Sequence, residues 1–246
     1  MRLHVVVDLP EERYDAAAGF WASALGWPAG APWPGHAELC SLEPPEGSAY
    51  AHLQRIGGAP RIHVDLESGD AAATNARARD LGAELVATHE GWTTLRSPGG
   101  LPFCTVGPVS GPVPTPVTWP DGHRSRLVQV CVDSPAPVHD TEVTFWRALL
   151  GGRWVGSPAG EFAGKWHADG SPVQLLFQRL EEQSGSVRAH LDLGADDVPA
   201  EVARLTTLGA EDVGPGRGWH VLRDPVGSLF CVTGNSPSGT RDRDLG

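Results

Sequence analysis

The sequence predicts an α+β protein that contains two tandem copies of one domain, and two observations support this fold class. The segment RIHVDLESGDAAATNARARDLGAEL, which begins at Arg61, is similar to RAHLDLGADDVPAEVARLTTLGAED, which begins at Arg188. The segment GWTTLRSPGGLPFCTV from Gly91 is likewise similar to GWHVLRDPVGSLFCVT from Gly218. Both pairs are offset by 127 residues, counted from Arg61 to Arg188 and from Gly91 to Gly218. A repeat at a fixed spacing indicates one structural unit that occurs twice.

The first part of each repeat is less similar, but it keeps its own offset of 125 residues. VVVD, which ends at Asp8, corresponds to VCVD, which ends at Asp133, and FWASALG from Phe20 corresponds to FWRALLG from Phe145. Two residues are therefore inserted later in the second repeat. The alignment covers nearly the whole of both copies.

The first half of each repeat begins with a strand and continues with a helix. β-branched runs predict the strands, and a glycine after each helix is the residue that most often ends one, because it adopts a left-handed conformation easily. Short strands and turns follow each helix. The expected ranges are 3–8 and 127–133 for the strands and 11–25 and 140–150 for the helices, which end at Gly26 and Gly151.

The second half of each repeat restarts the same cycle. In the first copy a strand is expected at 62–66, then a helix at 71–81 ended by Gly82, and then the strands GWTTLRS and PFCTV. Each repeat therefore contains two βαβββ-like units. Helices separated by several antiparallel strands are typical of an α+β layer in which helices cover one face of a sheet.

Domain boundaries follow from the repeat. We expect the first domain at residues 1–107, a proline-rich linker at 108–125, the second domain at 126–234 and a flexible tail at 235–246. Proline-rich linkers are extended and semi-rigid. The tail has no apolar periodicity, which favours disorder.

Composition excludes several classes of partner. The chain has 246 residues and a net charge of −11, which argues against nucleic acid or anionic lipid as a partner. Its 31 glycines and 22 prolines argue against a helical bundle. We find no apolar run long enough for a membrane span, no signal peptide and no CxxC pair among four cysteines, so we expect a cytoplasmic protein with reduced thiols.

The motifs HVVVD, FWASALGW, RIHVDL and GWTTLRSPGGLPFCTV resemble the vicinal oxygen chelate superfamily, which includes glyoxalases, bleomycin-resistance proteins and extradiol dioxygenases. The resemblance is to its glyoxalase-like branch, and it covers both repeats. It implies two tandem vicinal-oxygen-chelate domains, each of two βαβββ units that curve into a half-open barrel around a cavity. In the enzymes of this family a divalent metal in the cavity chelates two oxygens of the substrate.

The resemblance also implies metal-ligand positions. Alternation along the strand places Arg61, His63 and Asp65 on the face opposite the helix. His63 matches the second ligand position of the family, and His4 falls near the first. Cys104 stands where the enzymes have a glutamate, four residues after a turn glycine. A His4, His63 and Cys104 set suits zinc, whereas magnesium, calcium and manganese prefer oxygen ligands.

The remaining candidates line the predicted cavities of both repeats. These are Arg61, Asp65, Trp92, Gln129, Arg188, His190, Asp192, Trp219 and Cys231. A structural interpretation competes with each of them. The histidines would bond to neighbouring aspartates, the cysteines would be small buried side chains, the tryptophans would pack in the core and the arginines would pair with carboxylates.

Three functional hypotheses remain open. The leading one is a glyoxalase-like protein that binds a small organic molecule in one or both domain cavities, with aromatic walls and a few polar groups. The alternative is a divalent-metal-dependent lyase, isomerase or dioxygenase that uses His4, His63 and Cys104. In the third, one repeat keeps the function, and the first repeat has the richer potential site. Fusion of two copies predicts a monomer that is an internal pseudo-dimer.

Overall fold

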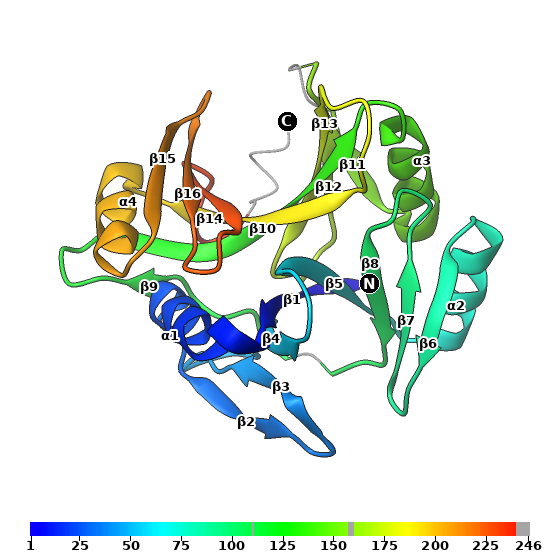
Figure 1. The fold of residues 1–246 in the computed structure, drawn as a ribbon, viewed down its shortest axis with the longest axis horizontal. Helices are drawn as coiled ribbons and strands as arrows, with labels where there is room; N and C mark the ends of the chain where they lie inside the picture. The colour runs from blue at the N-terminus through cyan, green and yellow to red at the C-terminus, as the bar shows by residue number, and fades with distance from the viewer. Residues whose placement is uncertain (110, 157–159, 240–246) are drawn as a thin grey trace. The chain divides into compact units, whose positions relative to one another are not determined.

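The computed structural model describes residues 1–109, 111–156 and 160–239, and its elements follow four βαβββ cycles in chain order (Figure 1). The first repeat contains β1 (Arg2–Pro10), η1 (Glu11–Arg13), α1 (Tyr14–Leu25), β2 (Ala29–Trp33), β3 (His36–Leu42), β4 (Ala51–Ile56), β5 (Arg61–Glu67), α2 (Ala71–Asp80), β6 (Glu84–Thr88), β7 (Trp92–Arg96) and β8 (Pro102–Val106).

The second repeat has the same order, preceded by one short strand. It contains β9 (Val117–Thr118), β10 (Arg124–Pro135), α3 (His139–Leu150), β11 (Arg153–Val155), β12 (Phe162–His167), β13 (Gln174–Leu180), β14 (Arg188–Ala195), α4 (Val198–Thr207), β15 (Glu211–Pro215), β16 (Trp219–Arg223) and β17 (Leu229–Thr233). The predicted α+β class and the two tandem copies are confirmed.

Each repeat forms one mixed sheet. The strand order is β2-β3-β4-β1-β5-β8-β7-β6 in the first repeat and β11-β12-β13-β10-β14-β17-β16-β15 in the second. The two orders correspond strand by strand, and β9 pairs with β10 outside the second series. Within the described residues neither sheet joins its two edge strands, so the sheets stay open, as the half-open barrel of the resemblance requires.

Local sequence explains where the helices begin and end. Pro10 ends β1, and a 3-10 turn over Glu11–Arg13 delays the start of α1 to Tyr14. Gly26 then ends α1 with a φ of 67°, a left-handed conformation that only glycine adopts without strain. The Asp70 carboxylate caps α2 by accepting a hydrogen bond of 2.9 Å from the Ala73 amide.

The described chain divides into two compact units, and this division does not follow the repeats. One unit combines Met1–Val5, His63–Ser110 and Val130–Ala189, and the other combines Val6–Ile62, Gly111–Gln129 and His190–Gly246. Each unit therefore takes its helices and outer strands from the second half of one repeat and the first half of the other. The boundaries expected from the sequence, 1–107 and 126–234, mark the two repeats. That each repeat is also a separate domain remains a prediction.

Each repeat has a Phe-Trp motif on its first helix, Phe20-Trp21 on α1 and Phe145-Trp146 on α3. The packing of these aromatic rings explains why each compact unit combines halves of both repeats. In the first unit Phe103 of β8 packs against Phe145 and Trp146 of α3, with ring centroids 5.9 and 5.1 Å apart. Figure 1 shows α2 and α3 beside β7 and β8. In the second unit Phe230 of β17 packs against Phe20 and Trp21 of α1 at 5.8 and 5.3 Å. The motif is buried in both copies, so the helix of one repeat covers strands of the other.

The expected C-terminal tail, residues 235–246, is partly packed against the rest of the chain. Within the predicted tail, Pro237 is buried and its carbonyl accepts a hydrogen bond of 2.7 Å from Arg126 Nε. Residues 240–246 of that tail lie outside the described residues.

None of the helices in the described part of the chain is long and apolar enough to cross a membrane.

Candidate functional site

The pairing of β5 with β8 brings a histidine, a carboxylate and a thiol together. The two strands are parallel, and their register sets Asp65 opposite Cys104. Because side chains alternate along a strand, His63 lies on the same face as Asp65. The potential ligand atoms of His63, Asp65 and Cys104 all lie within 4.8 Å of one another, and all three residues are buried.

Within this cluster, His63 Nε2 lies 3.6 Å from Asp65 Oδ1. The Cys104 sulfur also contacts the Thr94 hydroxyl of β7 at 3.5 Å. Burial raises the pKa of the Cys104 thiol, and the hydrogen bond from His63 offsets this rise only in part. The thiol is therefore protonated at neutral pH in the metal-free protein, and a metal that binds here must displace its proton.

The second repeat contains an equivalent cluster, formed by His190, Asp192 and Cys231 on β14 and β17. Their ligand atoms again lie within 4.8 Å of one another, and the register again sets Asp192 opposite Cys231. His190 Nε2 is 3.4 Å from Asp192 Oδ1. The other carboxylate oxygen of Asp192 accepts a hydrogen bond from the Gln129 side chain. Asp192 Oδ1 is buried and makes no hydrogen bond to any residue that the structure describes.

His4, expected as a ligand beside His63 and Cys104, pairs with a different partner. Its Nε2 lies 3.0 Å from Glu67 Oε2, and both residues are buried. The cluster around Cys104 contains Asp65 instead. Glu67 was not selected from the sequence, although it continues the alternation of residues 61, 63 and 65 on the same face of β5.

Both candidate arginines lie in ion pairs. Arg61 Nε donates a hydrogen bond of 2.6 Å to Asp8 Oδ2, whose side chain is fully buried. Arg188 makes two parallel hydrogen bonds to Glu182, at 2.8 and 2.6 Å, and thereby lowers the pKa of that carboxyl. These contacts agree with the structural interpretation of the two arginines, in which each pairs with a carboxylate.

The two candidate tryptophans are half-buried at the start of equivalent strands. Trp92 stacks on His89 with ring centroids 4.6 Å apart and an angle of 18° between the planes. Trp219 lies against Gly216, where an added Cβ would come within 2.3 Å of the indole nitrogen, so only glycine fits that position. Neither tryptophan is fully buried, so each keeps a ring surface that a ligand could contact.

Comparison with known families identifies the repeat. The model of the glyoxalase-like domain family matches the chain twice, over residues 4–106 and 129–233, which is most of its length. None of the curated proteins matches the sequence at a significant level.

Several solved structures share the fold. The Mn(II)-bound glyoxalase from Novosphingobium aromaticivorans superposes with a TM-score of 0.65 at 18% identity, covering 94% of this chain and 80% of that chain. A halotolerant catechol dioxygenase gives 0.64 at 13% identity, with coverages of 94% and 85%. The 2,2',3-trihydroxybiphenyl 1,2-dioxygenase from Sphingomonas wittichii strain RW1 gives 0.62 at 14% identity, with coverages of 94% and 89%. At these identities the likeness establishes the fold alone.

Proposed function

Because this chain belongs to the glyoxalase-like domain family, we propose that it binds a small organic molecule at a divalent metal held by His63, Asp65 and Cys104. One observation carries the proposal: an imidazole nitrogen, a carboxylate oxygen and a thiol sulfur, all buried, lie within 4.8 Å of one another on two adjacent strands. The equivalent cluster of the second repeat is a second candidate for the same role.

The donor atoms fit a metal in number, chemistry and spacing. Donors around a tetrahedral zinc lie about 3.3–3.8 Å from one another, given metal–ligand bonds of about 2.0–2.3 Å. A cluster that spans 4.8 Å at most needs an inward shift of about 1 Å or less to reach this spacing. In the second repeat, the buried Asp192 Oδ1 makes no hydrogen bond to the described residues and lies 3.4 Å from His190 Nε2, the nitrogen donor of the same cluster, as two ligands of one cation would.

The thiol decides which metal suits the cluster. Sulfur and nitrogen ligands favour zinc, whereas manganese sites are richer in oxygen ligands. The Novosphingobium glyoxalase is a Mn(II)-bound protein. We propose zinc for this chain, in contrast to that protein, because Cys104 supplies a sulfur ligand.

A bound divalent metal supplies a Lewis acid that polarises an oxygen of the ligand. His63, Asp65 and Cys104 would hold it, and the half-buried ring of Trp92 would contact the apolar part of a ligand. Buried thiolate and carboxylate ligands would also offset the charge of the metal in a site with little water. With the metal holding an oxygen of the ligand and Trp92 contacting its apolar part, the site can bind a ligand without catalysing a reaction.

The His4–Glu67 pair supports an enzyme as the second candidate. A histidine 3.0 Å from a buried carboxylate can take a proton and return it, which a lyase or an isomerase requires. Cys104 is less suited to this task, because a metal-bound thiolate is a poor general base. If the protein is an enzyme, we propose that His4 moves the proton and Glu67 orients it.

The proposal also covers the compartment and the oligomeric state of the protein. We propose a cytoplasmic monomer in which the two fused copies replace a dimer of single domains. All four cysteines of the chain lie among the described residues as buried free thiols, which supports a reducing compartment.

Elemental analysis tests the proposal directly. Protein purified without chelator or metal-affinity resin should contain stoichiometric zinc, and Cys104→Ser and His63→Ala should each remove the share bound in the first repeat. Cobalt-substituted protein should show a thiolate-to-cobalt absorption band that Cys104→Ser abolishes.

Cys40→Ser is the matched control, because Cys40 is an equally buried thiol that contacts Tyr14 instead of the cluster. It should leave the metal content unchanged. Wild-type protein that contains no metal and takes up none from added zinc would contradict the proposal. Proton abstraction that survives His4→Gln would remove His4 from the enzyme version.

A further inference from the structure

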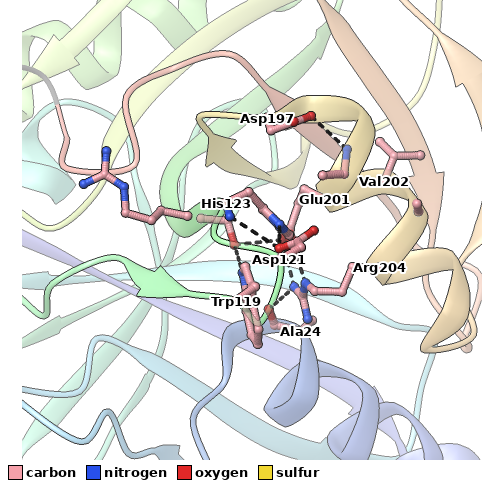
Figure 2. Close-up of polar contacts among 12 residues, drawn as sticks. Ala24, Trp119, Asp121, His123, Asp197, Glu201, Val202 and Arg204 are labelled. Carbon is pink, nitrogen blue, oxygen red and sulfur yellow. Dashed lines mark hydrogen bonds and ion pairs between the residues drawn. The ribbon is translucent and has the colours of Figure 1, made fainter.

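The end of the predicted linker is held by a network of side chains instead of running freely over the surface. Trp119 Nε1 donates a hydrogen bond of 2.8 Å to the Ser125 hydroxyl, and Ser125 Oγ donates one of 2.9 Å to Glu201 Oε1 of α4. Figure 2 shows Trp119, Asp121 and His123 gathered against Glu201 and Arg204. All of these residues belong to one compact unit.

His123 is the centre of this network, because each of its ring nitrogens meets a carboxylate. Nδ1 lies 2.5 Å from Asp121 Oδ1, and Nε2 lies 2.8 Å from Glu201 Oε2. A neutral imidazole has only one N–H and can donate to only one of them. Both hydrogen bonds can form together only when His123 is the imidazolium.

Arg204 ties the same carboxylate to a second helix. Its guanidinium donates to both oxygens of the fully buried Glu201, at 2.7 and 2.8 Å. It also donates to the carbonyls of Ser23 and Ala24 near the C-terminal end of α1, and it lies 3.5 Å above the ring of Trp119. The linker, α4 and the end of α1 therefore share one set of charges.

The charges around His123 balance only while it is protonated. Asp121 faces it from its own loop, and Glu201 and Arg204 face it from α4. The neighbouring pair of Arg124 and Asp196, 2.9 Å apart, is neutral as a pair and joins the start of β10 to the end of β14. With His123 charged, the network holds two cations and two anions, and loss of its proton leaves one anion in excess.

From this geometry we propose that segment 119–125 is a pH-dependent clasp: protonated His123 holds it against α4, and loss of the proton as the pH rises opens it locally. Neutral His123 keeps one hydrogen bond and presents a lone pair to the other carboxylate, so one contact turns repulsive. Because Glu201 is fully buried, its lost partner is not replaced by water unless the segment moves.

The direction of the effect follows from the surroundings of His123. Burial by itself lowers the pKa of His123, but the hydrogen bonds and charges of Glu201 and Asp121 outweigh burial and raise it above the ordinary value. A histidine whose folded pKa is raised stabilises the folded form fully below the unfolded pKa of about 6.5, and this contribution is lost as the pH rises through the folded pKa. The clasp is therefore closed below about pH 6.5 and opens as the pH rises through the folded pKa of His123, which lies above that value.

Hydrogen exchange of the full chain tests the proposal. After correction for intrinsic exchange rates, protection of the amides in 119–125 should fall by up to tenfold per pH unit between the unfolded pKa of about 6.5 and the folded pKa of His123, and should level off above the folded pKa, measured between about pH 6 and pH 9. Amides of β10 at residues 127–133 should keep constant protection, because the core does not open. His123→Gln should show low protection at about pH 6, with little further change at higher pH.

His36→Gln is the matched control, because His36 is half-exposed and contacts a single carboxylate, Glu38, at 3.3 Å. Its exchange in 119–125 should match the wild type. Asp121→Asn, which removes the more exposed of the two carboxylates, should shift the opening to lower pH. Protection that does not change with pH in the wild type, or a pH response that persists in His123→Gln, would overturn the clasp.

Discussion

Single side chains show that the two compact units make the same contact, a tryptophan bonded to a carboxylate, with the carboxylate at different positions. In one unit Glu142 of α3 accepts hydrogen bonds from Trp146 Nε1 at 2.7 Å and from the Gly99 amide at 2.9 Å. In the other unit Asp224 accepts from Trp21 Nε1 at 3.1 Å. The carboxylate lies on the helix in one unit and on the turn in the other, and both carboxylates come from the second repeat. Both lie beside an equivalent tryptophan.

The repeat alignment makes this exchange explicit. At the offset of 125, Glu142 corresponds to Ala17, and at the offset of 127, Asp224 corresponds to Ser97. The second repeat thus supplies both carboxylates, the first repeat has a small residue at each equivalent position, and each compact unit contains one carboxylate. Burial raises the pKa of both carboxyls, and their hydrogen bonds lower it only in part.

Glu142→Ala should therefore destabilise the protein by about 2–4 kcal/mol, because it leaves the Trp146 and Gly99 donors without acceptors in a buried site. Ser97→Asp in the same chain copies the arrangement of the other unit, and it should restore more than half of the loss. Urea unfolding of the two single variants and the double variant measures this coupling.

Ser97→Asp alone should be destabilising, since it places a second carboxylate beside Glu142. A double variant no more stable than Glu142→Ala would show that the two turns differ in more than the position of their carboxylate.

At the scale of the element, the same local signals recur at equivalent positions. Asp70 caps α2 and Asp197 caps α4, through hydrogen bonds of 2.9 and 3.0 Å to the third residue along. The parallel register of β5 with β8 also recurs in β14 with β17, and it places an aspartate opposite a cysteine in both. Secondary structure was accordingly the most predictable part of the fold.

Removal of one cap tests how much a helix end contributes. Asp70→Ala should lower the free energy of unfolding by about 1 kcal/mol, and Asp70→Asn should cost only a few tenths, because asparagine caps nearly as well as aspartate. Chemical denaturation measures both. Equal losses in the two variants would indicate that the charge of Asp70, and not its hydrogen bond to Ala73, stabilises α2.

At the scale of the whole molecule, stability depends on contacts between the two repeats, because each compact unit contains halves of both. Each unit packs the Phe-Trp motif of one copy against the last strand of the other, as Phe145 and Trp146 do against Phe103. A single repeat on its own would expose both sides of this contact. Burial of a large aromatic side chain contributes about 1.5–3 kcal/mol, so several such losses exceed the usual net stability of a domain.

Separation of the repeats should therefore prevent independent folding. Residues 1–107 and 126–246, produced apart, should each be unfolded or self-associated, and mixing them should restore native near-ultraviolet circular dichroism. Two stable monomeric fragments with native tryptophan signals would show that each repeat is a complete domain, as the sequence boundaries alone suggest.

The sequence by itself determined the repeat, the order of the elements, the ends of most helices and the candidate histidines and cysteines, because these depend on patterns along the chain. Tertiary structure alone decided which residues meet. The register of β5 with β8 places Asp65 beside His63 and Cys104, whereas His4 pairs with Glu67. It also decided that each compact unit joins halves of both repeats, and that His123 closes a network between the linker and α4. The physical reason is that a contact depends on strand register and packing between distant segments, and a single chain's local pattern does not specify either.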